Sequence, residues 1–564
     1  MNDGGVQATW ALHFVSSLQA AGITRAVVSP GSRSTPLVWA LGQSSISVIT
    51  VIDERVAGFV ALGASRADER PTLLVCTSGT AGAHYYPAVI EAHQTGVPLV
   101  VCTADRPPEL QGNGSSQTID QTRLFGEFST AFELGRPDGS EVALAGARRL
   151  AHQAVAAAES GPVHINVPLA KPLEPPADWV APSLPREAPR VGHRRPRGID
   201  PAEAASWLEP LARCRRIAIV AGPQRVGARA HTEAARELAE RLGATLLAEC
   251  ASQWGAGSDA HGISGIDDFI TDANNAPDGV LQLGFAPVSV KWTRWLATSG
   301  VPHVVVCERG YLDTQNTACL VHSGDALDAT MPALCLAAQH DVQANVVKKR
   351  QTYRCSSTEW KAAHATARSS DSVPGVAATA SVISALPTEA QLLIGNSLAI
   401  RDLDAASAAS PPRGPVLSQR GAAGIDGLIS GALGARWATG RPTCVLLGDV
   451  SAAHDLSGLA ALVQSGESVV VVVIDNGGGR IFERLPVANN PHTREQLTEH
   501  WLTPVQWPFA AVAEALGVTV FACDAATGDV ASAAREAFSR GGAVMLHVTV
   551  DGDDDRAARD GRAT

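Results

Sequence analysis

The sequence predicts an α/β protein built from three doubly wound parallel-sheet domains. Short runs of β-branched and aliphatic residues alternate with helix-like stretches along most of the chain, a pattern typical of parallel sheets covered by helices on both faces. Turns rich in Gly and Ser follow many of these runs, at the strand ends where open α/β sheets bind ligands. The 564 residues suffice for about three domains of roughly 100–200 residues each.

The first predicted domain spans residues 1–182. Each of its predicted strands leads into a polar turn: 26–28 into SPGSRSTPL, 49–52 into DER, 73–75 into CTSGTAGA, and 98–102 into TADRPPEL. Residues 161–176 are expected to contain the last strand and a Pro-rich exit. The Pro- and Arg-rich stretch that follows predicts an interdomain linker.

The second and third predicted domains span residues 198–345 and 370–552. Apolar runs at 216–222, 279–284 and 304–306 indicate strands of the second domain. The last third of the chain has the style of the first, with predicted strands in LLIGNS, TCVLLGDVS and VVVVVIDNGGG. The C-terminal residues DGDDDRAARDGRAT are expected to form a frayed acidic tail.

Composition excludes several classes of protein. A net charge of −11, from 45 basic and 56 acidic residues, argues against a nucleic-acid partner, which requires a concentrated basic face. The ten cysteines are scattered without disulfide-framework or zinc spacing, which indicates a reducing compartment. The N-terminus does not resemble a signal peptide, and no apolar run reaches the ~20 residues of a membrane span. We therefore expect a soluble, cytoplasmic protein.

The strongest site signal lies near residues 448–479. Asp449 follows one predicted buried strand, and Asn476 follows the next, 27 positions later. Both are therefore expected at the carboxyl ends of neighbouring parallel strands. A carboxylate and an amide oxygen there can share one Mg²⁺ with phosphate oxygens and a backbone carbonyl, and the glycines at 477–479 permit close approach of a ligand. A helix cap and a turn residue are the alternative interpretations.

Other candidate residues also follow predicted strands. Glu54 begins a predicted helix, where it either stabilises the helix N-terminus or hydrogen-bonds a ring nitrogen of a bound heterocycle. Gln117 lies in a Gly/Ser-rich loop that could fold over a ligand. Arginine forks suit carboxylates, so several at strand ends indicate a substrate with more than one carboxylate; they are Arg33, Arg106, Arg401 and Arg420.

These features resemble thiamine-diphosphate enzymes, which contain pyrimidine-binding, central and diphosphate-binding domains in that order. The stretch from Gly448 to Asn476 is similar to the cofactor motif of that superfamily. A closer resemblance covers essentially the whole chain. It is to the 2-succinyl-5-enolpyruvyl-6-hydroxy-3-cyclohexene-1-carboxylate synthases of menaquinone biosynthesis, on the motifs SPGSRSTPL, DERVAGFVALG, TSGTAGAHYYPAVIEA, TADRPPEL, SQRGAAGIDG and DNGGGRIFERLP.

The resemblance implies a carboligating transferase with thiamine diphosphate and Mg²⁺, or Mn²⁺ in its place, as cofactors. The metal ligands would be Asp449, Asn476 and the carbonyl of Gly478. Glu54 would protonate N1′ of the aminopyrimidine, so that the imino form deprotonates the thiazolium carbon, and Ile425 would hold the cofactor bent. The implied cofactor-binding residues are Glu54, Ser397, Ile425, Asp449, Ser451, Asn476 and Gly478.

In this family the thiazolium carbanion attacks 2-oxoglutarate, CO₂ leaves, and the resulting carbanion adds to isochorismate. The resemblance implies Glu54, Gln117 and Arg420 as catalytic residues, and Lys291 or Arg294 as a basic residue from the central domain, with Lys291 favoured. It also implies a homodimer with active sites shared between subunits, or a homotetramer. The implied substrate-binding residues are Ser32, Arg33, Arg106, Gln117, Lys291, Arg401, Arg420, Ile481 and Phe482.

Three residues depart from the family pattern: His84, Tyr85 and Asp475, the last adding negative charge beside the expected metal. The nearest alternative is an acetolactate-type synthase acting on a simpler 2-oxo acid, which would not need so many arginines. A dinucleotide-binding oxidoreductase is disfavoured because no predicted strand leads into G-x-G-x-x-G. A non-catalytic sensor is disfavoured because it could bind the cofactor without Glu54.

Overall fold

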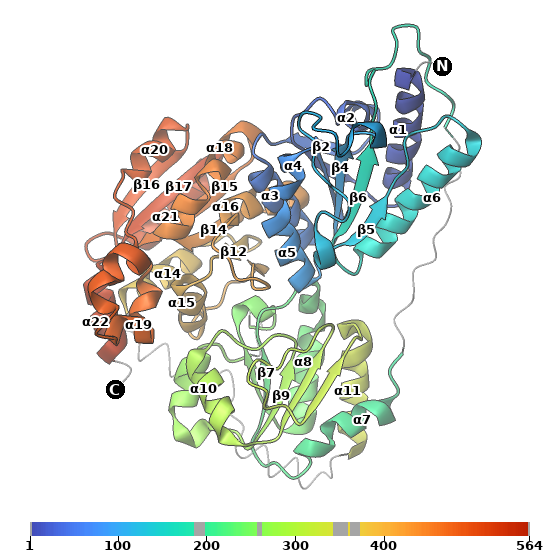
Figure 1. Cartoon of the computed structure of the whole chain (residues 1–564). Coiled ribbons are helices and arrows are strands. Elements are labelled where there is room, and N and C mark those ends of the chain that lie inside the picture. The colour runs from blue at the N-terminus through green and yellow to red at the C-terminus, as the bar shows by residue number, and fades with distance from the viewer. Residues whose placement is uncertain (1–2, 185–197, 256–261, 342–358, 361–372, 562–564) are drawn as a thin grey trace.

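The computed structural model describes residues 3–184, 198–255, 262–341, 359–360 and 373–561. They form three parallel sheets with helices on both faces, as the sequence predicts (Figure 1). Residues 185–197 of the expected Pro- and Arg-rich linker lie outside the described residues. No described helix combines the length and the apolar character needed to cross a bilayer.

The first domain contains a six-stranded sheet of order β2-β1-β3-β4-β6-β5. All of its strand pairs are parallel. The strands are β1 (Arg25–Val28), β2 (Ser47–Thr50), β3 (Thr72–Cys76), β4 (Leu99–Asp105), β5 (Thr130–Glu133) and β6 (Val163–Pro168), and the helices are α1 (Asp3–Ala20), α2 (Thr35–Gly42), α3 (Glu54–Asp68), α4 (Thr80–Ala83), α5 (Tyr86–Thr95) and α6 (Glu141–Ala158).

The central domain contains a five-stranded parallel sheet of order β11-β10-β9-β7-β8. In Figure 1 it lies below the other two domains. Its strands are β7 (Ile217–Ala221), β8 (Thr245–Ala248), β9 (Gly279–Leu283), β10 (His303–Cys307) and β11 (Leu320–Ser323), and its helices are α7 (Pro201–Leu208), α8 (Thr232–Leu242), α9 (Ile266–Thr271), α10 (Val290–Ser299) and α11 (Leu327–Asp341).

The third domain contains a six-stranded parallel sheet of order β13-β12-β14-β15-β17-β16. This order repeats that of the first sheet strand for strand. The strands are β12 (Gln391–Ile394), β13 (Val416–Ser418), β14 (Thr443–Gly448), β15 (Val469–Asp475), β16 (Thr519–Asp524) and β17 (Ala543–Thr549), and the helices are α14 (Pro374–Ala385), α15 (Leu398–Ser407), α16 (Leu428–Thr439), α17 (Asp449–His454), α18 (Leu456–Ser465), α19 (Pro486–Asn489), α20 (Phe509–Ala515), α21 (Val530–Arg540) and α22 (Gly552–Gly561).

The expectation of a frayed C-terminal tail is wrong over residues 552–561. These residues form α22, in which Asp555 is buried. Arg559 donates to Asp555 at 2.7 Å and to both carboxylate oxygens of Asp402 at 2.7 and 2.9 Å. The helix is held by these ion pairs rather than by an apolar face, because its sequence contains few apolar residues.

Helices α3 and α16 join the first and third domains. They pack so closely that a Cβ on Gly63 would lie 2.0 Å from the carbonyl oxygen of Gly431, so a side chain is excluded at this crossing. A single cluster of buried apolar residues continues from the first sheet across the two helices to the third sheet, and includes Phe59, Leu62 and Leu433. The first and third domains of one chain therefore share a core.

Candidate active site

A cavity of about 470 Å³ opens at the carboxyl edge of the third sheet, and its lining residues fall between Thr379 and Thr503. It brings together most of the residues that the sequence assigns to the cofactor. The predicted residues that line it are Ser397, Ile425, Asp449, Ser451, Asn476, Gly478, Ile481 and Phe482.

The strand pairing confirms that Asp449 and Asn476 follow neighbouring parallel strands, since Gly448 of β14 lies opposite Ile474 of β15. Asp449 is 5% exposed, and its Oδ2 accepts no hydrogen bond from the described residues. Burial, together with the nearby carboxylate of Asp475, raises the pKa of Asp449 to about 6. A buried carboxylate oxygen without a donor is what a bound cation would satisfy.

The backbone at Gly478 completes this edge of the cavity. Its φ of +117° is left-handed, and a Cβ there would lie 2.3 Å from the carbonyl oxygen of Leu502, so only glycine fits. The carbonyl of Gly478, the carboxylate of Asp449 and the amide oxygen of Asn476 are hard oxygen donors of the kind that Mg²⁺ prefers. These residues could therefore hold a magnesium ion.

Asp475, which adds negative charge beside Asp449, forms hydrogen bonds with two partners of its own. Its Oδ2 lies 2.8 Å from Nε2 of His547, and its Oδ1 accepts a hydrogen bond from the Gly477 N–H at 3.1 Å. The hydrogen bond with His547 lowers the pKa of Asp475. The additional carboxylate is thus anchored to β17, beside Asp449.

Ser397 is a strained residue at the edge of the same cavity. It has φ +66° and ψ −127° between β12 and α15, a conformation that side chains other than glycine rarely adopt and that costs of order 1–3 kcal/mol. Its carbonyl oxygen accepts a hydrogen bond of 2.6 Å from Arg401 Nη1. The turn is therefore fixed to Arg401, whose Nε lacks a hydrogen-bond partner among the described residues.

The first-domain candidates lie on the carboxyl edge of the first sheet, in the turns that follow β1, β2 and β4. Gln117 Nε2 donates to the carbonyl of Ser78 at 3.1 Å, and Arg106 donates to the Ser78 hydroxyl. Arg33 is buried and donates to the carbonyl of Leu169 at 2.6 Å. Burial and the positive charge of Arg106 lower the pKa of Arg33. The structure thus groups Arg33, Arg106 and Gln117.

Two more candidates occupy the turns at the starts of helices in this domain. Ser32 is exposed and accepts, through its carbonyl, a hydrogen bond of 2.7 Å from the Thr35 hydroxyl. Glu54 is half-buried at the first position of α3, where Asp53 supplies the N-cap by accepting from the Arg55 N–H. Glu54 is therefore not needed as a cap.

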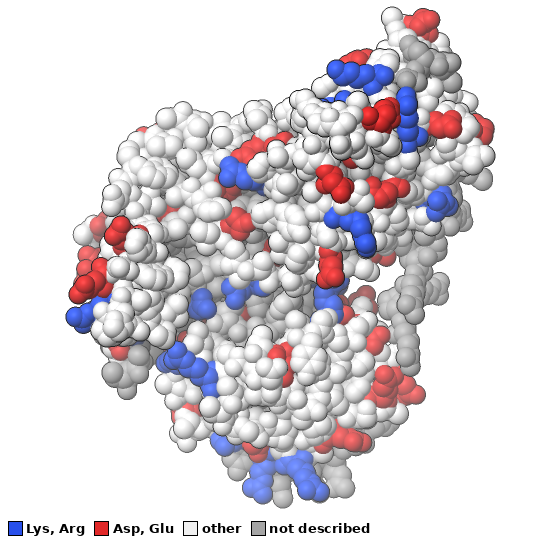
Figure 2. All heavy atoms as spheres, in the orientation of Figure 1, with Lys and Arg blue, Asp and Glu red and all other residues white. Residues whose placement is uncertain are grey.

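Lys291 and Arg401 line a second, smaller cavity of about 100 Å³ where the central domain meets the third. Lys291 Nζ donates to the Thr271 hydroxyl at 3.0 Å, whereas Arg294 is exposed. Asp402 lines both this cavity and the larger one, so the two adjoin. Figure 2 shows basic side chains where the central domain meets the other two.

Arg420 follows β13 and donates from Nη1 to the Asn396 Oδ1 at 2.9 Å. Burial lowers its pKa, although the carboxylates of Glu249 and Glu91 oppose this effect. The sequence did not single out Asn396 or Arg484 as site residues, although Asn396 lies in LLIGNS and Arg484 lies in DNGGGRIFERLP. It also missed His500 and Trp501, which line the larger cavity from a segment without a strand end or motif to indicate them.

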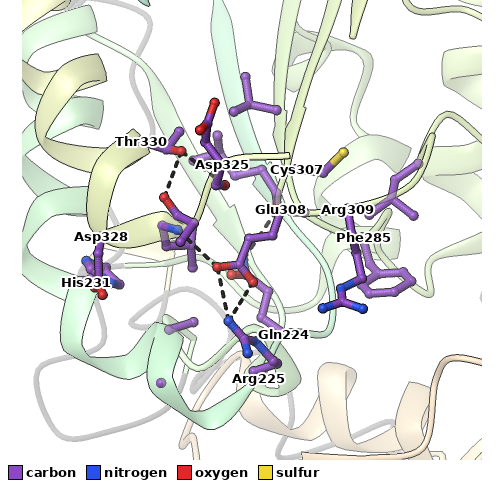
Figure 3. Close-up of a pocket in the computed structure, with 18 of the residues that line it drawn as sticks. Gln224, Arg225, His231, Phe285, Cys307, Glu308, Arg309, Asp325, Asp328 and Thr330 are labelled. Atoms are coloured by element: carbon purple, nitrogen blue, oxygen red, sulfur yellow. Dashed lines mark hydrogen bonds and ion pairs between the residues drawn. The ribbon is translucent and has the colours of Figure 1, made fainter. Parts of the chain in front are cut away.

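A further cavity of about 180 Å³ lies in the central domain where it meets the first (Figure 3). It opens between the neighbouring strands β7 and β9. From this point the chain adds strands first on one side of the sheet and then on the other, and open α/β sheets bind ligands at such a point. Arg225 faces Glu308 across the cavity, with Nη2 2.9 Å from Oε2, and His231 pairs with Asp328 at 2.9 Å. These four side chains thus satisfy one another in two pairs.

The first and third domains each match a known protein family. Residues 9–124 match the family described as thiamine pyrophosphate enzyme, N-terminal TPP binding domain, and residues 405–548 match the corresponding C-terminal TPP binding domain. A benzoylformate decarboxylase from Polynucleobacter necessarius superposes with a TM-score of 0.70 at 17% identity, covering 96% of this chain and 99% of that one. Fold and site together define a thiamine-diphosphate enzyme.

Relatives with a more specific name align over nearly the whole chain. A 2-succinyl-5-enolpyruvyl-6-hydroxy-3-cyclohexene-1-carboxylate synthase from Sorangium cellulosum is 38% identical over 98% of this chain and 94% of its own length. Synthases of the same name from Geobacillus thermodenitrificans and Halobacterium salinarum are 37% and 36% identical, over 95% and 96% of this chain and 92% and 95% of their own. The chain belongs to this family of synthases.

Proposed function

We propose that this protein decarboxylates 2-oxoglutarate and transfers the remaining succinyl unit to isochorismate, giving 2-succinyl-5-enolpyruvyl-6-hydroxy-3-cyclohexene-1-carboxylate and CO₂ in menaquinone biosynthesis. The observation that carries the proposal is the cavity beyond β14 and β15, lined by the family's motif residues, in a chain whose relatives bear the synthase name. We further propose that the enzyme works in the cytoplasm.

Asp449, Asn476 and the carbonyl of Gly478 would bind Mg²⁺, or Mn²⁺ in its place, and the ion would bind the diphosphate. The unpartnered Oδ2 of Asp449 supports this assignment. Ser451, which is buried at the start of α17, and Ser397 would contact the cofactor from the same edge. When bound, the cofactor supplies a thiazolium carbon that becomes a nucleophile on deprotonation.

Glu54 would hold a proton at N1′ of the aminopyrimidine. Its side chain is half-buried, and Asp53 already caps the helix, so the Glu54 carboxylate is available to a ligand. Ile425, in the wall of the larger cavity, would hold the cofactor bent, so that the aminopyrimidine could take the proton from the thiazolium carbon. Ile481 and Phe482 would exclude water around the reacting carbon.

The basic residues would orient two dicarboxylate substrates. Arg33 and Arg106, with Ser32 and Gln117, form one group at the first sheet. Lys291 and Arg401 line the smaller cavity between the central and third domains, and the positive charge of Arg420 lies close enough to Arg401 to help lower its pKa. Partly desolvated guanidinium groups bind carboxylates strongly because little water has to be displaced.

We propose that the active site forms between two subunits of a homodimer, which could pair again into a tetramer. The larger cavity is lined by third-domain residues, whereas Glu54, Arg33 and Arg106 lie on the first sheet. A second chain would bring its first domain to this cavity. Dilution below the dimer dissociation constant should then abolish turnover, and full activity of a stable monomer would contradict the shared site.

The deciding experiment measures CO₂ release from 2-oxoglutarate with thiamine diphosphate and Mg²⁺, with and without isochorismate. We expect release stimulated by isochorismate and a new adduct in mass spectrometry. Release from pyruvate but not from 2-oxoglutarate would instead assign an acetolactate-type reaction and overturn the proposed function.

A further inference from the structure

We propose that Glu91 and Arg66 of the first domain are positioning residues for the third-domain segment 418–425, which carries Arg420 and ends at Ile425. The inference rests on the proposed function in one respect: it takes Arg420 to contact a substrate carboxylate. Neither Glu91 nor Arg66 lines the larger cavity, so both would act through the segment.

Glu91 and Arg66 form a buried ion pair between α5 and α3. Arg66 Nη2 lies 2.9 Å from Glu91 Oε1, and the two side chains are 7% and 4% exposed. Arg66 Nη2 also donates to the Thr95 hydroxyl at 3.0 Å, and that hydroxyl donates to the Glu91 carbonyl at 2.7 Å. A pair this desolvated and this well hydrogen-bonded has a fixed geometry.

The same two side chains hold the backbone of segment 418–425. Glu91 Oε1 accepts a hydrogen bond from the Gly421 N–H at 3.1 Å, and Oε2 accepts one from the Ala422 N–H at 2.6 Å. Arg66 Nη1 donates to the carbonyl of Ser418. The first domain therefore holds the backbone of the segment on both sides of Arg420, through charge-assisted hydrogen bonds.

Asn396 holds the segment from the opposite side. Its Nδ2 donates to the carbonyls of Gln419 at 3.0 Å and Gly424 at 2.6 Å, while its Oδ1 accepts from Arg420. Asn396 immediately precedes the strained Ser397. Arg420 is thus fixed between the ion pair of Glu91 and Arg66 in the first domain and the turn at Ser397, which lines the larger cavity.

This arrangement gives Glu91 two effects on Arg420. Its carboxylate fixes the backbone on which Arg420 sits, and its negative charge favours the charged form of the buried guanidinium. Ala422 and Ala423, by contrast, are exposed. Without the hydrogen bonds to Glu91, the segment would depend on its contacts with Asn396 and Arg66, and Arg420 would lose its fixed orientation toward a substrate.

The test uses Glu91→Gln in the full-length enzyme. The amide keeps one acceptor oxygen but presents an NH₂ group to a backbone N–H, so one hydrogen bond to the segment is lost. We expect hydrogen–deuterium exchange of the peptide covering 418–425 to accelerate by about tenfold or more. The KM for one acidic substrate should rise by about tenfold or more, with little change in kcat. In an Arg420→Ala background, Glu91→Gln should raise this KM no further.

Asp68→Asn is the matched control, because Asp68 accepts both bonds of a similar ion pair from Arg25, at 2.7 and 2.8 Å, away from the segment. It should lower stability but leave the KM values and the exchange of 418–425 unchanged. Unchanged exchange in Glu91→Gln would overturn the inference, and so would faster exchange with an unchanged KM. If the wild-type enzyme were inactive on 2-oxoglutarate, only the proposed function would be overturned. Hydrogen–deuterium exchange of the peptide covering 418–425 would still test whether Glu91 holds the segment.

Discussion

Arg559 of α22 binds both carboxylate oxygens of Asp402 in α15, at 2.7 and 2.9 Å, across 157 positions of sequence. Burial raises the pKa of Asp402, and Arg559 opposes that rise. Asp402 follows Arg401 directly and lines the larger cavity. The C-terminal helix therefore stabilises the helix that carries a proposed substrate arginine.

Arg559→Ala should destabilise the protein by about 3–5 kcal/mol, because it leaves two buried carboxylates, Asp402 and Asp555, without their cation. Chemical denaturation measures this loss. Arg556→Ala, in the same helix but 46% exposed, should cost only about 0–1 kcal/mol. Equal effects of the two substitutions would show that the buried ion pair with Asp402 contributes no more to stability than an exposed ion pair does.

Asp449→Ala should abolish the binding of Mg²⁺ and thiamine diphosphate together, since the carboxylate would hold the ion that in turn holds the diphosphate. Isothermal titration calorimetry measures both affinities. Asp529→Ala removes an exposed N-cap of α21 in the same domain, and should lower stability by about 1 kcal/mol without changing either affinity. Normal cofactor binding by Asp449→Ala would refute the metal site.

Glu54→Gln should bind thiamine diphosphate but lose turnover, because the amide cannot exchange a proton with the aminopyrimidine. Calorimetry and CO₂ release, measured on the same preparation, separate the two properties. The helix itself should be unaffected, since Asp53 is its cap. Turnover at the wild-type rate would remove Glu54 from the mechanism.

Arg106→Ala and Arg401→Ala should each raise the KM for an acidic substrate by a factor corresponding to about 1.5–3 kcal/mol, the contribution of a charged hydrogen bond. Steady-state kinetics with each substrate in turn would also reveal which arginine serves which carboxylate. Arg556→Ala is again the control, with unchanged kinetics expected. If both variants keep wild-type KM values, the arginines do not bind substrate.

Stability should depend on pH through Asp404, whose pKa is raised to about 7 by burial. The folded protein then binds this proton more tightly than the unfolded chain, so the contribution of Asp404 to stability falls as the pH rises through 7. Relative to wild type, Asp404→Asn should gain about 1.4 kcal/mol or more in free energy of unfolding between pH 5 and pH 8. A difference between variant and wild type that does not change with pH would contradict this assignment.

The fold and the position of the candidate metal site could be predicted from sequence because their signals are local. Buried strands such as β14 and β15 are continuous apolar runs, and Asp449 and Asn476 stand where those runs stop. Strands β5, β8, β11, β13, β16 and β17 were not predicted. All of these except β17 are edge strands, and β5, β11 and β16 have partly exposed residues. Their sequences need not be uniformly apolar.

The long-range polar contacts around the site could not be predicted in the same way. Arg559 meets Asp402, and Glu91 meets Gly421, across 157 and 330 positions, and one sequence contains no signal for such partners. The α22 sequence is strongly polar, so its hydrophobicity does not indicate a packed helix there. Only the three-dimensional arrangement supplies the opposite charge that stabilises it.

The identical strand order of the first and third sheets gives the single chain an internal pseudo-twofold symmetry. Helix α3 follows the second strand of its sheet, α16 follows the second strand of the other, and these equivalent helices are the ones that pack at Gly63 and Gly431. A symmetric contact of this kind is what a homodimer forms around its axis. The chain thus has the architecture expected if a gene for a self-associating half had been duplicated and fused, with the central domain inserted between the copies.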